Sequence, residues 1–181
     1  MIFNETPLPG VFHITAEPNS DERGSFSRLF CSDEFAALGI NFSPVQVNLS
    51  KNLRARTLRG LHFQREPHGE EKLVQVTAGR IWDVAVDLRP GPTQGQWWGT
   101  ELSRENGAGL YLPKGIAHGF ITLEANSDVL YHMGQMFVPG HGAGIVWNDT
   151  DIGIDWPFEP DVINDRDQSL PTLNAYLAEN D

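Results

Sequence analysis

The sequence predicts one all-β domain over residues 1–181, an antiparallel barrel or sandwich with a few short peripheral helices. Three observations support this prediction. The chain has 181 residues, which is about the length of one domain. Its 18 glycines and 12 prolines suit frequent turns. Short segments with alternating apolar and polar residues recur between those turns, and this period of two is typical of strands.

The first predicted element is a short helix over residues 32–39, for which Ser32 is the expected N-cap, acids occupy the first turn and Gly39 follows the end. Strand signals dominate after this helix, beginning with the alternating segment 44–50. A short terminal helix is predicted over residues 173–179. The remaining strands are predicted over residues 72–77, 81–88, 96–102, 109–112, 118–123 and 129–133.

The composition argues against several classes of function. The net charge is -11, so we expect neither general binding to nucleic acid nor binding to anionic membranes. No apolar run approaches the length of a transmembrane helix, and the first residues do not resemble a signal peptide. A single cysteine, Cys31, excludes an intramolecular disulfide and predicts a reducing compartment, the cytoplasm.

Basic residues are concentrated in one segment of this acidic chain. Nine lysines and arginines but only five acids lie between Arg23 and Arg80, so this segment carries a net positive charge. Such a segment predicts a local site for an anionic ligand. A solvated basic face is the alternative, and charge alone leaves both interpretations open.

Two segments resemble the paired motifs of cupin barrels. Residues 113–118 have the form Pro-x-Gly-x-x-His, in which a tight glycine turn would deliver His118 into the mouth of a barrel. The first motif would contain His62. Metal-binding cupins carry His-x-His there, whereas this chain has Gln64 at the second position. Because a metal site needs three or four ligands, we expect a cupin-type jelly roll without a metal.

The segment from Arg59 to Gln64 reads Arg-Gly-Leu-His-Phe-Gln, and Lys72-Leu73-Val74 follows it. Together they resemble the core signature of the dTDP-4-dehydrorhamnose 3,5-epimerases, sugar epimerases of the cupin superfamily. The resemblance covers residues 2–173 and rests on several independent motifs. Further segments resemble landmarks of this family in the same order, at residues 21–26, 46–50, 83–89, 115–120, 130–131, 147–149, 156–157 and 164–167.

The resemblance implies epimerisation, without a cofactor, at C3 and/or C5 of a nucleotide-linked 4-keto-6-deoxy sugar. The most direct reaction converts dTDP-4-dehydro-6-deoxyglucose to dTDP-4-dehydrorhamnose. By position, His62 matches the base and Asp167 its partner carboxylate, for which Asp165 is the alternative. Tyr131 matches the acid on the opposite face. Lys72 matches the cation near the C4 oxyanion.

The resemblance also implies how the nucleotide sugar is bound. Arginines suit a diphosphate because they pair with phosphate oxygens in bidentate fashion. The family further implies a homodimer, in which an early strand of one subunit completes the other's barrel and brings the Arg23 region to the partner's site. The positions that match binding residues are Arg23, Arg59 and Arg166 near the diphosphate, Gln46, Asn48 and His118 in the barrel, and Phe137, where the family usually has a tyrosine stacked on thymine.

Departures from the family pattern cluster around recognition rather than around His62, Lys72 and Tyr131. Many members have glutamate at the position of Arg28, Glu-Arg at 142–143 and Thr-Asp-Tyr at 134–136. This chain has Gly142-Ala143 and Gly134-Gln135-Met136 at the latter two places. The exact nucleotide, the sugar, the pathway product and the choice between C3, C5 or both therefore stay open.

Two other classes of function remain as alternatives at this point. One is a barrel that binds nucleotide sugars but does not turn them over, against which intact His62 and Tyr131 argue. The other is a metal-dependent cupin enzyme, against which Gln64 argues.

Overall fold

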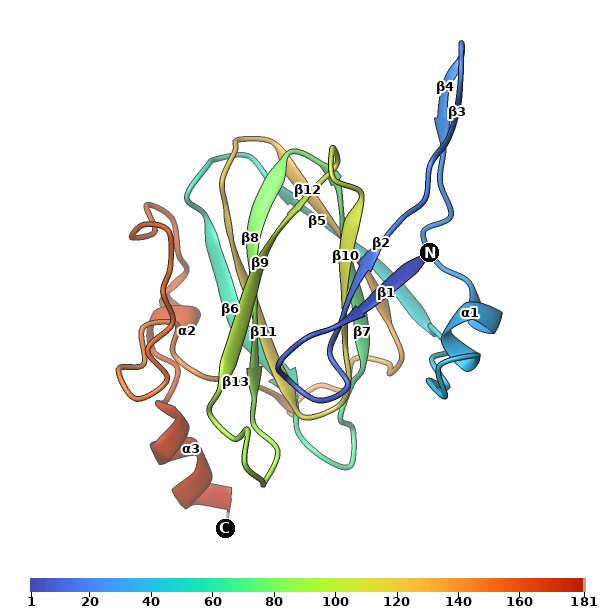
Figure 1. Ribbon diagram of the computed structural model, residues 1–181. Helices are drawn as coiled ribbons and strands as arrows, with labels where there is room; N and C mark the ends of the chain where they lie inside the picture. Colours follow the sequence, from blue (N-terminus) through green and yellow to red (C-terminus); the bar gives the residue numbers. More distant parts are fainter. Residues whose placement is uncertain (181) are drawn as a thin grey trace.

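The structure is a computed structural model that describes residues 1–180. Two antiparallel sheets face each other and enclose the core (Figure 1). The predicted antiparallel barrel of jelly-roll type is confirmed. In spatial order, the six-stranded sheet contains β1 (Ile2–Glu5), β2 (Phe12–Thr15), β10 (Ala108–Leu112), β7 (Lys72–Ala78), β12 (Ser127–Met133) and β5 (Gln46–Asn52). The five-stranded sheet contains β13 (Gly142–Gly144), β6 (Leu58–Gln64), β11 (Ile116–Thr122), β8 (Arg80–Asp87) and β9 (Trp97–Ser103).

Apolar side chains on both faces of the central strands explain why the two sheets are covered on both sides. In β7, Val74 belongs to the core between the sheets, whereas its neighbour Leu73 packs outward. In β8, Ala85 points inward and Val84 and Val86 point outward. This alternation follows from the period of two along a strand. Each sheet therefore needs a cover on its outer face.

Short helices provide these covers, and they lie on opposite sides of the barrel (Figure 1). On the six-stranded sheet, Phe35 of α1 (Ser32–Ala36) packs with Leu73 and Tyr111. On the five-stranded sheet, Leu173 of α3 (Leu173–Asn180) packs with Val84. Within residues 1–180, the helices are all too short and polar to cross a membrane.

The predicted helix at residue 32 is confirmed, but its N-cap is not the predicted Ser32. The N-cap is Cys31 and makes no side-chain capping bond, so Ser32 is the first helical residue. The end of the helix follows the prediction. Gly39 has φ +74°, and Ile40 N donates to Phe35 O over 3.1 Å, which closes the helix in a Schellman-type turn.

Most predicted strands agree with the structure to within about two residues, but several elements were not predicted. The consequential omission is β6, because it carries His62. The others are β1, β2 and β13, the hairpin of β3 (Asn19–Asp21) and β4 (Gly24–Phe26), and α2 (Asp165–Gln168). The β3–β4 hairpin extends away from the barrel, at the upper right of Figure 1.

Candidate active site

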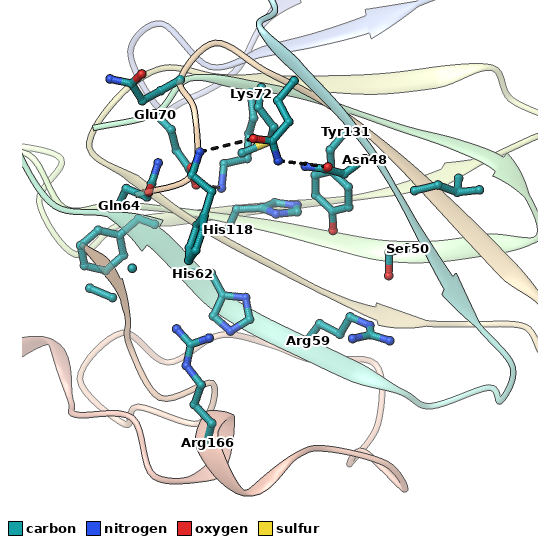
Figure 2. Close-up of a pocket in the computed structure, with 18 residues that line it drawn as sticks. Asn48, Ser50, Arg59, His62, Gln64, Glu70, Lys72, His118, Tyr131 and Arg166 are labelled. Carbon is teal, nitrogen blue, oxygen red and sulfur yellow. Dashed lines mark hydrogen bonds and ion pairs between the residues drawn. The ribbon is translucent and has the colours of Figure 1, made fainter. Parts of the chain in front are cut away.

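A cavity of about 430 Å³ opens between the two sheets, within the size range of small-molecule sites. Strands of both sheets contribute to its wall, and α2 closes one side. In Figure 2, His62 and Arg166 lie lower in the view, and Lys72 and Tyr131 lie above them. Nine of the eleven residues singled out from the sequence line this cavity: Gln46, Asn48, Arg59, His62, Lys72, His118, Tyr131, Phe137 and Arg166.

The tenth, Asp167, lies directly behind His62. Its Oδ1 is 2.7 Å from His62 Nε2, and its Oδ2 accepts a hydrogen bond of 3.1 Å from Gly60 N. The side chain of Asn164 caps α2 by accepting a bond of 2.7 Å from Asp167 N. Of the two acids weighed from the sequence, Asp167 is the one that meets His62, and Asp165 is exposed.

Gly60 allows this arrangement because β6 and β11 approach each other closely there. Its φ is +127°, and a Cβ at this position would lie 2.5 Å from Gly119 Cα. A side chain at residue 60 would therefore collide with the backbone of the neighbouring strand. The same glycine donates its N–H to Asp167. One residue thus allows the close approach of β6 and β11 and also orients the carboxylate that pairs with His62.

The Asp167 carboxyl is ionised at neutral pH. Burial alone would raise its pKa, but the hydrogen bonds from His62 and from Gly60 N–H and the nearby charge of Arg166 together hold the pKa below its ordinary value. An ionised Asp167 favours the His62 tautomer with hydrogen on Nε2. That tautomer leaves Nδ1 as the nitrogen that can accept a proton.

Tyr131 reaches the cavity from β12 in the six-stranded sheet, whereas His62 comes from β6 in the five-stranded sheet. Burial raises the pKa of the Tyr131 phenol, the Asp83 carboxylate raises it further, and Arg59 partly opposes both effects. The phenol therefore stays protonated at neutral pH. A protonated phenol and a basic imidazole thus enter one cavity from two different sheets.

A second histidine–carboxylate pair lies beside Tyr131, and its acid was not singled out from the sequence. His118 Nε2 is 2.7 Å from Asp83 Oδ1, and these side chains are only 4% and 0% exposed. The His118 ring also meets the Tyr131 ring edge to face, at 5.9 Å between centroids. Asp83 could have been noticed as the single acid in the otherwise apolar run of residues 81–86.

Glu70 is another lining residue that the sequence did not single out. Its Oε1 forms an ion pair of 2.7 Å with Lys72 Nζ, and both side chains are more than nine-tenths buried. The pair holds the ammonium of Lys72 in the cavity wall. A buried ion pair is costly to break by removing one partner, so Glu70 restrains the position of Lys72.

Arg23, the eleventh predicted residue, does not reach the cavity of its own chain. It lies in the β3–β4 hairpin, where its side chain is 85% exposed and pairs with Asp21. The basic segment predicted from the sequence as a site for an anionic ligand does not face the cavity as a whole. Of its nine basic residues only Arg59 and Lys72 line the cavity, and Arg80, for example, pairs with Glu124 outside it.

Three of the six departures from the family pattern lie in the cavity wall. Gln135, Gly142 and Ala143 line it, whereas Arg28 pairs with Glu34 elsewhere, at 2.7 Å. Within residues 1–180, no three histidines, cysteines or acids lie close enough together to hold a metal ion.

The fold and the site define a jelly-roll protein with a polar cavity of small-molecule size. A family model described as dTDP-4-dehydrorhamnose 3,5-epimerase matches residues 5–175, and the chain belongs to this family. The predicted class of enzyme, an isomerase of the carbohydrate-epimerase kind, is thereby confirmed.

Individual relatives agree with this assignment. The dTDP-4-dehydrorhamnose 3,5-epimerase of Methanothermobacter thermautotrophicus is 44% identical over 94% of both chains. A dTDP-4-dehydrorhamnose 3-epimerase of Streptomyces niveus is 37% identical over 92% of this chain and 81% of its own length. The crystal structure of the Legionella pneumophila 3,5-epimerase in complex with dTDP-4-keto-L-rhamnose superposes with a TM-score of 0.92, at 37% identity, and covers 98% of this chain and 95% of its own.

Proposed function

We propose that this protein epimerises C3 and/or C5 of a nucleotide-linked 4-keto-6-deoxy sugar without a cofactor. The substrate proposed is dTDP-4-dehydro-6-deoxyglucose, and the product is dTDP-4-dehydrorhamnose. One observation carries the mechanism. His62, backed by Asp167 at 2.7 Å, and the protonated Tyr131 enter one cavity from two different sheets. Inversion at carbon needs a base on one face and an acid on the other, and these two residues supply both.

The proposed step is a proton transfer through an enolate. The C4 ketone acidifies the hydrogens at C3 and C5, and His62 removes one of them. The electrons of the broken C–H bond form a C–C double bond while the C4 oxygen becomes negative, and Lys72 stabilises this oxyanion. Tyr131 then delivers its proton to the opposite face of the same carbon, and the C4 carbonyl forms again. Solvent restores the two side chains, so no redox partner is required.

The remaining lining residues suit the nucleotide diphosphate. Arg59 and Arg166 are the cations proposed to pair with its phosphate oxygens. Asn48, Gln46 and His118 are proposed to make the polar contacts in the barrel. Phe137, which is 61% exposed at the cavity, is proposed to stack on the base.

The experiment that tests this function is incubation with dTDP-4-dehydro-6-deoxyglucose in deuterated buffer, followed by NMR at C3 and C5. We expect deuterium at each inverted carbon, and the labelled positions tell a 3,5-epimerase from an epimerase of one centre. No deuterium at either carbon would instead support the alternative of a non-catalytic binding barrel.

Two variants separate the proposed proton carriers in the same assay. His62→Asn should abolish deuterium exchange at both carbons, because the enolate no longer forms. Tyr131→Phe should retain exchange, since the base can return solvent deuterium to the same face, while inversion falls about 10²-fold or more. Exchange in His62→Asn would refute the base assignment. Inversion at the wild-type rate in Tyr131→Phe would show that a group other than Tyr131 is the acid.

We also propose that the enzyme works as a homodimer in the cytoplasm. In this arrangement the β3–β4 hairpin of one subunit reaches the partner's cavity, which would give Arg23 the binding role that it lacks within its own chain. The single cysteine supports the reducing compartment. No role in binding nucleic acid or membranes is proposed.

A further inference from the structure

Gln64 occupies a position in β6 that serves no step of the proposed reaction, although it lies in the cavity wall (Figure 2). Its side chain is nine-tenths or more buried and makes two hydrogen bonds to the connection between β12 and β13. Gln64 Nε2 donates to Met136 O over 3.2 Å, and Val138 N donates to Gln64 Oε1 over 2.8 Å. The side-chain amide of Gln64 therefore forms hydrogen bonds with the backbone on both sides of Phe137.

A second glutamine, Gln46, binds the backbone of Phe137, the residue between these two contacts. Phe137 N donates to Gln46 Oε1 over 3.4 Å, and Gln46 Nε2 donates to Asn48 Oδ1 over 3.1 Å. Gln46 belongs to the six-stranded sheet and Gln64 to the five-stranded sheet. Side chains from both sheets thus restrain the backbone of residues 136–138, which is not part of a strand.

The exposure of Phe137 indicates what these hydrogen bonds do for the site. The ring is 61% exposed yet lines the cavity, so little apolar packing fixes it. Burial contributes little to the orientation of this ring, so the hydrogen bonds to the adjacent backbone are its main restraint. An aromatic face held in advance binds a planar ring with a smaller loss of conformational entropy.

We infer that Gln64 is a positioning residue that holds Phe137 as a fixed platform for the planar base of the substrate, and so determines affinity for the nucleotide rather than the rate of proton transfer. This inference rests on the proposed function, because it assumes a nucleotide substrate. The hydrogen bonds of the Gln64 side chain go to the backbone beside the platform, and Phe137 makes the stacking contact with the base.

The test uses dTDP as the probe and Gln64→Met, a substitution of similar shape that removes both hydrogen bonds. We expect the Kd for dTDP to rise about tenfold, equivalent to about 1.4 kcal/mol. The kcat at saturating sugar substrate should stay within about twofold of wild type, because the proton carriers are untouched. Gln94→Leu is the control, since it removes a bond of 3.3 Å to Leu88 O in a loop outside the cavity and should change neither value.

A double-mutant cycle decides whether Gln64 acts through Phe137. Phe137→Ala should weaken dTDP binding by itself, and adding Gln64→Met to it should cause no further loss. Additive losses, an unchanged Kd or a fall in kcat alone would overturn the inference. Gln64→Leu is the second variant, and failure of both Gln64 variants to fold would make Gln64 a purely structural residue. If wild type itself does not bind dTDP, the proposed substrate class fails, and the inference fails with it.

Discussion

At the residue scale, Asp167 tolerates substitution poorly, because its one carboxylate accepts hydrogen bonds from two different donors. Its two oxygens accept from His62 Nε2–H and from Gly60 N–H. An amide has only one oxygen, so an asparagine here would have to turn its NH₂ group toward one of these donors. The substitution therefore conserves the volume of the side chain but not its hydrogen bonding.

We predict that Asp167→Asn lowers the rate of deuterium exchange at C3 and C5 by about 10²- to 10⁴-fold, because His62 loses its preferred tautomer and orientation. Exchange measured by NMR at saturating substrate checks this. Asp165→Asn is the matched control, since Asp165 precedes it by two residues and is exposed, and it should keep the wild-type rate. Equal losses in both variants would contradict the assignment of Asp167.

The sequence was informative about which residue types enter the cavity and about the pair of His62 with Asp167, but not about the other pairs in the cavity wall. His62, Lys72 and Tyr131 could be selected because the motifs around them are distinctive. Asp83 carried only the weak signal of one acid in an apolar run, and Glu70 carried none, because its role lies in the ion pair that it forms with Lys72 two residues further along the chain. Asp83 gains its place through His118 on the neighbouring strand β11, and that pairing depends on register, which a single sequence does not specify.

At the scale of elements, strands with regular alternation could be predicted, whereas strands interrupted by glycine or formed by few residues could not. β6 was missed because Arg59 and Gly60 break its apolar pattern, although that glycine is what lets β6 approach β11. The β3–β4 hairpin is exposed throughout and, apart from Phe26, polar or glycine, so it offers no alternating hydrophobic signal. α2 is a single turn, which is below the length that periodicity can reveal.

Gly60 and Gly24 provide a matched pair for testing the close approach of β6 and β11. Their φ angles are +127° and +129°, but a Cβ at Gly24 would meet nothing within 4 Å. We predict that Gly24→Ala costs about 1–2 kcal/mol of free energy of unfolding from backbone strain alone. Gly60→Ala should cost about 3–5 kcal/mol, because the backbone of Gly119 blocks the new methyl group. Denaturant unfolding measures both, and equal losses would show that the strands can separate.

At the scale of the whole molecule, the outer face of β5 and the residue before it carry apolar side chains that the rest of residues 1–180 leaves about half uncovered. Val45, Val47 and Leu49 are each about half exposed, and they alternate with the polar residues Gln46 and Asn48. β5 is also the edge of its sheet. An edge strand with exposed apolar side chains favours association, and this observation supports the proposed homodimer.

We predict that light scattering at micromolar concentration gives the mass of a dimer. Val47→Lys should shift the protein toward the monomer, because it places a charge in the apolar stripe of β5. Leu38→Lys puts the same charge on an apolar residue of similar exposure beyond α1, and should leave the dimer intact. A wild-type monomer would refute the dimer and would leave Arg23 without a proposed ligand.

The shared role of Asp167 also makes the molecule sensitive to acid. Because its pKa is lower in the folded state than its ordinary value, folding favours the ionised form. The resulting stabilisation is complete at neutral pH and is lost as the pH falls through the folded pKa. The free energy of unfolding of wild type should therefore exceed that of Asp167→Asn by a constant amount above about pH 5, and this gap should narrow below about pH 4. A single proton taken up by Asp167 would weaken its hydrogen bonds to the imidazole of His62 and to the backbone of β6 in the same event, so the orientation of the base and the anchoring of this strand should be lost together on acidification.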